Sequence, residues 1–584
     1  MKQFAKYVLA TITGLFLCLI VLFIIIFSTV AAIGSSASKS TGVAENSILE
    51  ISIKNNIVDR SNDNELAYLL AGGEDVSSTS LEDVRNALEK AKNDKNIKGI
   101  FLKIGFFEGG FASIQEMRQH ILNFKKSGKF IYAHADVMDE KGYYLASAAD
   151  SIYMNPAGDF FLNGFSSQVL YLKDAFDKIG VEMQAIRVGE YKSAVEPFIS
   201  NSMSNENRAQ VQAYLDELYN IFITETALSR NMGADSLKNM ANNFTIQSGK
   251  IALEKGLVDG LFFMDEIKNQ FAKRIKVTPK NLSIIKYKKY INNDNSSSNN
   301  KERIAVIYAT GEIGMGQSAN DGIGSISLSK TLEQVRKDDK IKAVVLRINS
   351  PGGSALASDI IWREVKLLQQ KKPLIVSMGN VAASGGYYIA MPADTIVAMP
   401  STITGSIGVF LLVPNAQKLM NDKLGIKFET VKTGEYADLG SIDRPLNTRE
   451  RQILQGYANR VYADFLDRVA EGRKMDTASV DKVARGKVWV ATQAKGANLV
   501  DVLGNLDTAI SIAYWKANLK KSEADLDVFP KPGNPFERFL NMQSSIKVKT
   551  MEKELGSFYT YWKLISETAQ TKGVQMRLPF EINF

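Results

Sequence analysis

The chain is poor in cysteine and histidine, the side chains that most often bind metals or carry protons near neutral pH. Cys18 is the only cysteine among 584 residues, which excludes an internal disulfide and any cysteine-based zinc site. The two histidines, His120 and His134, both lie in the first half of the chain and fit no recognised motif. A catalytic serine in the second half would therefore need a base other than a histidine close to it in sequence.

Long runs of one charge are also absent. The formal net charge of +8 is modest for this length, and no dense Lys/Arg block with interleaved aromatics occurs, so nucleic acid is not an expected partner. With 45% hydrophobic and 23% charged residues, the composition is that of an ordinary globular protein. The length is sufficient for several domains.

One long apolar run is present, at the N-terminus. No charged residue occurs from Tyr7 to Ile33, and about 20 residues of helix suffice to cross a bilayer. Lys2 and Lys6 precede the run, which favours a cytoplasmic N-terminus with the rest of the chain on the far side. Small residues at 28–32 leave a cleaved signal peptide as the alternative. We expect a cytoplasmic tip at 1–6, a transmembrane anchor at 7–33 and a linker at 34–46.

The same module occurs twice in the remainder. Gly142-Tyr143-Tyr144 recurs as Gly386-Tyr387-Tyr388, 244 positions later (386 − 142), and Gly189-Glu190-Tyr191 recurs as Gly434-Glu435-Tyr436, 245 positions later (434 − 189). A repeat of this length indicates a duplicated domain. We expect copy one at 47–290, an Asn/Ser linker at 291–302, copy two at 303–530 and a helical tail at 531–584.

Each copy alternates strand and helix patterns, which predicts an α/β fold with parallel sheets. In copy two, Ala343–Ile348 is a buried-strand pattern with one arginine, Ser354–Gln370 has helical spacing, and Leu374–Met378 is the next strand. Two long helices, Glu206–Arg230 and Thr448–Gly472, are candidates for packing between copies or subunits.

The copies differ at two positions in opposite senses. Copy two has Ser384 where copy one has Glu140, and copy one has Lys192 where copy two has Ala437. A serine nucleophile needs a base, and a lysine can serve when burial lowers its pKa to roughly 7–8. The complementary differences indicate one composite site built from both copies. The alternatives are a helix N-cap for Ser384 and a solvated surface role for Lys192.

Glycines accompany the serine. The backbone N–H of Gly385 can help hold an oxyanion, and Gly352-Gly353, at the end of the neighbouring predicted strand, can supply the second donor because glycine lets backbone approach a substrate closely. The alternative is that these glycines only form turns.

These motifs resemble the signal peptide peptidase A family, also called protease IV, in its long membrane-anchored form. The resemblance covers nearly all of Ile48–Pro530 and does not extend motif by motif into the tail. Its most specific parts are Asn349-Ser350-Pro351-Gly352-Gly353-Ser354, Ala382-Ala383-Ser384-Gly385-Gly386-Tyr387-Tyr388, Thr404-Gly405-Ser406-Ile407-Gly408-Val409 and Gly189-Glu190-Tyr191-Lys192-Ser193.

The resemblance implies two tandem Clp protease/crotonase-like domains, each a parallel-sheet ββα superhelix, after the transmembrane helix. It implies Ser384 as nucleophile, Lys192 as general base, Ser406 as a hydroxyl orienting the lysine, and Gly353 and Gly385 as oxyanion-hole residues. It further implies apolar peptide substrates such as signal-peptide remnants, a homo-oligomer (a tetramer in the family), no cofactor or metal, and a single-pass location in the bacterial inner membrane with the catalytic domains outside the cytoplasm.

Two other classes of function share some of these features. A crotonase-like acyl-CoA enzyme would share the fold and a glycine-lined oxyanion hole, although an extracytoplasmic location argues against a CoA substrate. A non-catalytic oligomeric membrane scaffold would have lost the serine or the lysine, and both are present here.

Overall fold

The computed structural model describes residues 43–60, 78–291, 302–318, 322–531 and 573–577, together with 3, 4, 6, 7, 9–18, 20 and 21 near the N-terminus, which are helical. Much of the predicted anchor at 7–33 therefore lies outside the described residues, as do most of the two predicted linkers and most of the tail. Within the described residues, no helix has both the length and the apolar character that a membrane span requires.

Two parallel sheets carry the two copies, and their strands follow the same spatial order. In both sheets every neighbouring pair in this order is parallel. In the first sheet this order is β8 (Ser283–Lys286), β1 (Ser47–Val58), β3 (Ile97–Glu108), β4 (Phe130–Ala135), β5 (Ser151–Met154) and β7 (Gly260–Leu261), and in the second it is β20 (Ala524–Phe529), β9 (Glu302–Thr310), β12 (Ile341–Ser350), β14 (Leu374–Ala383), β15 (Thr395–Ala398) and β19 (Val502–Leu503). Short strands outside this shared order complete both sheets: β2 (Thr79–Ser80) pairs with β1, β16 (Ile403–Gly405) with β14, and β18 (Val488–Val490) antiparallel with β16. The shared strand order shows that the two copies found in the sequence have the same sheet topology.

Helices follow strands within each copy. Copy one has α3 (Leu81–Asn93), α4 (Phe111–Lys125) and α5 (Glu140–Ala146), and copy two has α13 (Ser325–Lys337), α14 (Ala355–Gln369) and α15 (Gly385–Tyr388). In α14 the Ser354 side chain caps the first turn by accepting from the Ala357 amide, and Ile361, Val365 and Leu368 give one buried stripe. The strand and helix patterns predicted for copy two are confirmed, since they fall on β12, α14 and β14.

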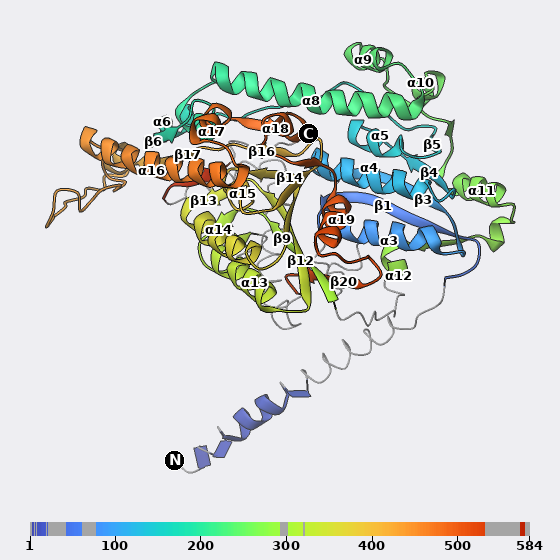
Figure 1. Cartoon of the computed structure of the whole chain (residues 1–584), viewed down its shortest axis with the longest axis horizontal. Coiled ribbons are helices and arrows are strands. Elements are labelled where there is room, and N and C mark those ends of the chain that lie inside the picture. The colour runs from blue at the N-terminus through green and yellow to red at the C-terminus, as the bar shows by residue number, and fades with distance from the viewer. Residues whose placement is uncertain are drawn as a thin grey trace.

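The two long helices each pack on the other copy (Figure 1). From α8 (Asn205–Arg230) in copy one, Gln210 Oε1 accepts from the Val488 amide of copy two at 3.2 Å. From α16 (Thr448–Arg473) in copy two, Arg451 donates to Gln184 Oε1 of copy one at 2.7 Å. Packing between copies, one of the two predicted roles of these helices, is therefore confirmed.

A third sheet joins the copies. Its order is β11 (Ile323–Gly324), β10 (Ile313–Gly314), β13 (Gly352–Ser354), β21 (Gln575–Arg577), β17 (Val409–Asn415) and β6 (Glu182–Val188). The strand β6 belongs to copy one, yet it crosses to copy two and pairs antiparallel with β17, from Val188↔Val409 to Glu182↔Asn415 (Figure 1). This crossing carries the segment after β6 into copy two.

Of the tail predicted as helical over 531–584, the structure describes residue 531 and residues 573–577. Its described residues 573–577 contain the strand β21 instead of a helix, and the remainder of 532–584 lies outside the described residues. The difference has a physical reason, because β13 and β17 offer unpaired backbone groups on facing edges and an inserted strand satisfies them. Local sequence does not reveal such an edge.

Candidate active site

Three strand ends meet where the candidate residues lie. The parallel strands β14 and β16 (Ile403–Gly405) pair Ala383 with Gly405, so Ser384 and Ser406 follow adjacent strand ends. The antiparallel pair of β6 and β17 holds Val188 opposite Val409, which places the loop after β6 beside the loop before β17. The fold thereby brings Lys192, Ser384 and Ser406 to one point.

The Lys192 amine makes three contacts there. Its Nζ lies 2.9 Å from Ser384 Oγ, and 3.0 Å from both the carbonyl oxygen and the Oγ of Ser406. All three residues have 0% relative exposure. The surface role considered for Lys192 is therefore wrong, and the contact joins a lysine of copy one to a serine of copy two.

Burial controls the charge of this amine. It holds the pKa of Lys192 well below its ordinary value of 10.5, and desolvation is the only cause. No carboxylate of the described residues forms an ion pair that would favour the ammonium form. The site therefore favours a neutral amine, which has a lone pair available to accept a proton.

Ser384 has an unusual backbone. Its φ of 55° and ψ of −115° lie outside the regions that non-glycine residues usually occupy, a conformation that costs about 1–3 kcal/mol. Two backbone hydrogen bonds hold it, from the Ser384 amide to Gly405 O at 2.8 Å and from the Tyr388 amide to Ser384 O at 2.9 Å. Ser384 stands at the N-cap position of α15, as the alternative predicted, but its side chain accepts from no amide of that helix.

The predicted glycines line the same place and permit close backbone approach. Gly353 has φ of 153°, and a Cβ built on it would lie 2.1 Å from Ile313 O. A Cβ on Gly352 would lie 2.7 Å from the amide nitrogen of Gly385. No side chain fits at either position, and the Gly385 amide directly follows Ser384.

A turn that the sequence analysis missed supports the lysine. The Tyr191 amide donates to Arg485 O at 3.0 Å, the Gly486 amide to Ile407 O at 2.7 Å, and the Ser406 amide to Lys487 O at 2.7 Å. The turn Arg485-Gly486-Lys487 thus connects the Lys192 loop with the Ser406 loop. The sequence contains a signal for this turn. In this part of the repeat the copies lie 242 positions apart, as Leu257 and Leu499 do (499 − 257), and at that offset copy two has Gly486 where copy one has Phe244.

In copy one, a carboxylate side chain occupies the position that corresponds to Ser384. Glu140, at the position of Ser384, accepts from the amides of Asn163 at 2.6 Å and Gly164 at 2.9 Å. Burial raises the pKa of Glu140, and these hydrogen bonds oppose the rise. Copy one therefore uses this position for structure.

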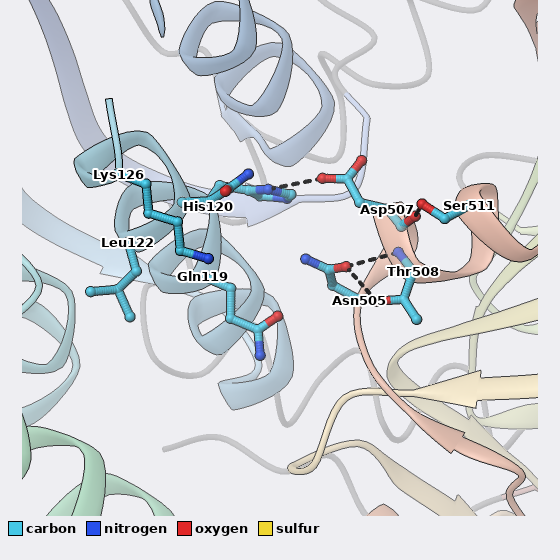
Figure 2. A pocket seen from close by; sticks show the side chains of 9 residues that line it. Gln119, His120, Leu122, Lys126, Asn505, Asp507, Thr508 and Ser511 are labelled. Atoms are coloured by element: carbon cyan, nitrogen blue, oxygen red, sulfur yellow. Dashed lines mark hydrogen bonds and ion pairs between the residues drawn. The ribbon is translucent and has the colours of Figure 1, made fainter. Parts of the chain in front are cut away.

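A pocket of about 410 Å³ lies elsewhere, between α4 and α19 (Leu506–Lys516), and holds a histidine (Figure 2). His120 Nδ1 lies 3.4 Å from Asp507 Oδ2, and burial lowers the pKa of His120. The hydroxyl of Ser511, which also lines the pocket, donates to Asp507 O at 2.7 Å, so it makes no serine–histidine pair. His134, on β4, contacts Phe262 O through Nε2 at 3.0 Å. Neither histidine contacts Ser384.

Comparisons with known proteins agree with the duplicated architecture. The model of peptidase family S49 matches residues 123–278 and 366–520, one segment in each copy, and the Clp protease model matches residues 295–404. The chain is 35% identical to the chloroplastic serine protease SPPA of Arabidopsis thaliana over 86% of this chain and 74% of that protein. It is 34% identical to Protease 4 of Haemophilus influenzae (86% and 85% covered) and 35% identical to Protease 4 of Salmonella typhi (78% and 75% covered). The chain therefore belongs to peptidase family S49, as a serine peptidase with two tandem repeats and Clp protease-like parallel sheets.

Proposed function

We propose that the chain is a membrane-anchored serine endopeptidase with a Ser–Lys dyad, in which Ser384 is the nucleophile and Lys192 the general base. The observation that carries this proposal is the 2.9 Å contact between the Lys192 amine and the Ser384 hydroxyl, both fully buried. Family membership also leaves the acyl-CoA enzyme and the non-catalytic scaffold without support.

The contacts of Lys192 fit the role of a base. A neutral amine has two N–H groups and one lone pair, and the two N–H groups can donate to the carbonyl oxygen and the Oγ of Ser406. The lone pair then faces Ser384 Oγ and can take its proton as the oxygen attacks a peptide carbonyl. Ser406 in this scheme orients the amine.

The remaining steps follow from this arrangement. The tetrahedral oxyanion is held by the backbone N–H groups of Gly353 and Gly385, which develop their full effect in a site without water. The protonated Lys192 gives its proton to the leaving amine, and an acyl-enzyme forms on Ser384. Water then attacks the ester while Lys192 again acts as the base.

The family resemblance supplies the proposed setting. The uncharged run from Tyr7 to Ile33 would anchor the chain in the inner membrane, with Lys2 and Lys6 on the cytoplasmic side. The substrates would be apolar peptides on the other side, including signal-peptide remnants.

Assembly into a homo-oligomer has support in copy two. The loop carrying Lys192 in copy one packs on copy two, where the Tyr191 amide donates to Arg485 O, whereas its counterpart, residues 424–442 around Ala437, is mostly exposed within the part of the chain that the structure describes. Exposed apolar side chains gather there, and Val431 is 96% exposed. The others are Leu424, Ile426, Phe428 and Ile442. We propose that this segment docks on a second copy of the chain.

A covalent probe tests the nucleophile and the base together. A peptidyl phosphonate is expected to label the wild-type chain at Ser384, as intact mass and peptide mapping will show. The labelling rate is expected to rise with pH through the lowered pKa of Lys192, because only the neutral amine accepts the serine proton. Labelling at neutral pH in Ser384→Ala, or a rate independent of pH from 5 to 9, would contradict the proposal.

The turn at Gly486 gives a second prediction. A Cβ built on Gly486 would lie 2.5 to 2.7 Å from the backbone nitrogen, Cα and Cβ of Lys192, and φ at this glycine is +82°. Gly486→Ala is therefore expected to shift the amine and lower kcat for peptide hydrolysis by roughly 10²-fold, since a displacement of about 1 Å has that effect.

The matched control is Gly456→Ala on α16, because a Cβ at Gly456 meets nothing within 4 Å. It is expected to retain wild-type kcat. Thermal unfolding of both variants separates misplacement from misfolding, and equal kcat for the two variants would show that Gly486 does not position Lys192.

A further inference from the structure

A buried side chain of α8 contacts both neighbours of Lys192. Gln210 is 4% exposed, and its Nε2 donates to the carbonyl oxygen of Tyr191 at 3.2 Å and to the Oγ of Ser193 at 3.0 Å. Tyr191 and Ser193 are the residues immediately before and after Lys192. One carboxamide therefore restrains the segment on both sides of the proposed base.

The other end of this carboxamide contacts the strand that leads to Ser406. Its Oε1 accepts from the amide of Val488, the first residue of β18, at 3.2 Å. The strand β18 pairs antiparallel with β16, where Val488 lies opposite Gly405, the residue before Ser406. Gln210 thus joins the Lys192 segment of copy one to the strand pair of copy two that ends at Ser406.

The orientation of the carboxamide follows from its partners. A backbone N–H only donates, so the oxygen of Gln210 faces Val488 and the nitrogen faces the Tyr191 carbonyl. Asn207 Oδ1 accepts from Gln210 Nε2 at 3.2 Å, and Asn207 Nδ2 donates to the buried Glu196 carboxylate at 2.9 Å. The two N–H groups of Gln210 are shared among three oxygens. Because the carboxylate only accepts, this network has one arrangement of donors and acceptors.

Copy two has no equivalent of this glutamine. The helices α8 and α16 both span 26 residues and begin 243 positions apart (448 − 205), so Gln210 corresponds to Ile453, which has no side-chain hydrogen-bonding group. Copy two also has Ala437 at the position of Lys192. The lysine and the glutamine therefore occur together in copy one and are both replaced in copy two.

We propose that Gln210 is a positioning residue for Lys192, an inference that rests on the proposed role of this lysine as the general base. By holding Tyr191 and Ser193 against β18, the carboxamide keeps the amine within reach of Ser384. Gln210 itself gives and takes no proton. Its removal is therefore expected to change the rate of the chemical step and not the binding of substrate.

Gln210→Met tests this, because it removes the hydrogen bonds and keeps an unbranched apolar side chain. Its kcat for an unstructured apolar peptide is expected to fall by roughly 10²-fold at unchanged KM, since a displacement of about 1 Å has that effect. The matched control is Gln212→Met on the same helix, where the glutamine is exposed and donates to exposed Asp216. The control is expected to retain wild-type kcat, and wild-type kcat in Gln210→Met would overturn the inference.

The pH dependence separates positioning from a general loss of structure. Burial alone lowers the pKa of Lys192, so an amine that moves towards water regains a higher pKa. Because the neutral amine is the reactive form, the rise of kcat with pH is expected to move to higher pH by about one unit in Gln210→Met. A pH dependence that coincides with the wild-type curve, beside a lower kcat, would assign Gln210 a structural role only and overturn the inference.

A second variant covers the case in which thermal unfolding shows that Gln210→Met is destabilised. Gln210→Glu keeps the shape and the acceptor for the Val488 amide, but it places a carboxylate oxygen against the Tyr191 carbonyl. The negative charge also favours the ammonium form of Lys192, so the rise of kcat is expected to move to higher pH. Gln212→Glu adds the same charge at an exposed position and is expected to match the wild type. An unchanged curve and kcat in Gln210→Glu would overturn the inference.

Lys192→Met, assayed beside these variants, separates the inference from the proposed function. The double variant with Gln210→Met is expected to be no slower than Lys192→Met, because Gln210 acts only through the lysine; a further loss would contradict this. If Lys192→Met is inactive while Gln210→Met keeps the wild-type kcat and pH dependence, the inference fails and the dyad stands. If Lys192→Met hydrolyses the peptide at the wild-type rate, both fail.

Discussion

Ser384→Ala and Lys192→Met are each expected to lower kcat/KM for an unstructured apolar peptide by roughly 10⁴-fold or more, because each removes an atom that takes part in bond formation or proton transfer. Lys192→Met keeps an unbranched side chain that reaches to the ε position and removes the amine. The double variant is expected to be no slower than the slower single variant, since the two groups act as one unit. The measurement is steady-state hydrolysis, with oligomer size checked by light scattering.

Matched controls remove the same chemical groups elsewhere. Ser511→Ala on α19 and Lys255→Met after α10 (Gly249–Glu254) change residues that are solvent exposed. Both are expected to retain wild-type kcat/KM. Near-normal hydrolysis by Lys192→Met would assign the base to another group, and near-normal hydrolysis by Ser384→Ala would remove the proposed mechanism.

The largest effect on stability is expected at Arg347. Its guanidinium on β12 lies 2.7 Å from Asp59 and 2.6 Å from Glu116, and the exposed fractions of the three side chains are 1%, 3% and 2%. Arg347→Met leaves two buried carboxylates without their cation, so the free energy of unfolding is expected to fall by about 3–5 kcal/mol. Urea denaturation followed by circular dichroism measures this change.

An exposed ion pair is the control. Lys337 lies 2.6 Å from Glu333 with exposed fractions of 67% and 45%, and Lys337→Met is expected to change stability by less than about 1 kcal/mol. Adding Asp59→Asn and Glu116→Gln to Arg347→Met is expected to restore part of the loss, because the uncompensated charges are then gone. A triple variant no more stable than Arg347→Met would show that the lost charge balance is not the cause.

The Arg347 cluster also shows where sequence patterns stop being informative. The arginine stands in an apolar run that predicts a buried strand, and the strand is there. The pattern does not say what neutralises the arginine, since Asp59 is 288 positions away in the chain. The partner comes from copy one, and only the packing of the two copies brings it close.

The sequence alone determined the duplication, the parallel α/β class and, in copy two, the strands β12 and β14 and the helices α14 and α16, because these depend on local spacing and apolar periodicity. It also identified Ser384 and Lys192 as complementary differences between the copies. Only the tertiary structure decided their contact, since it depends on the pairing of β6 with β17 across the copies. The turn at Gly486 and the strand at 575–577 were decided in the same way. Their conformations are stabilised by backbone hydrogen bonds to segments far away in sequence, for which the local residues carry no pattern.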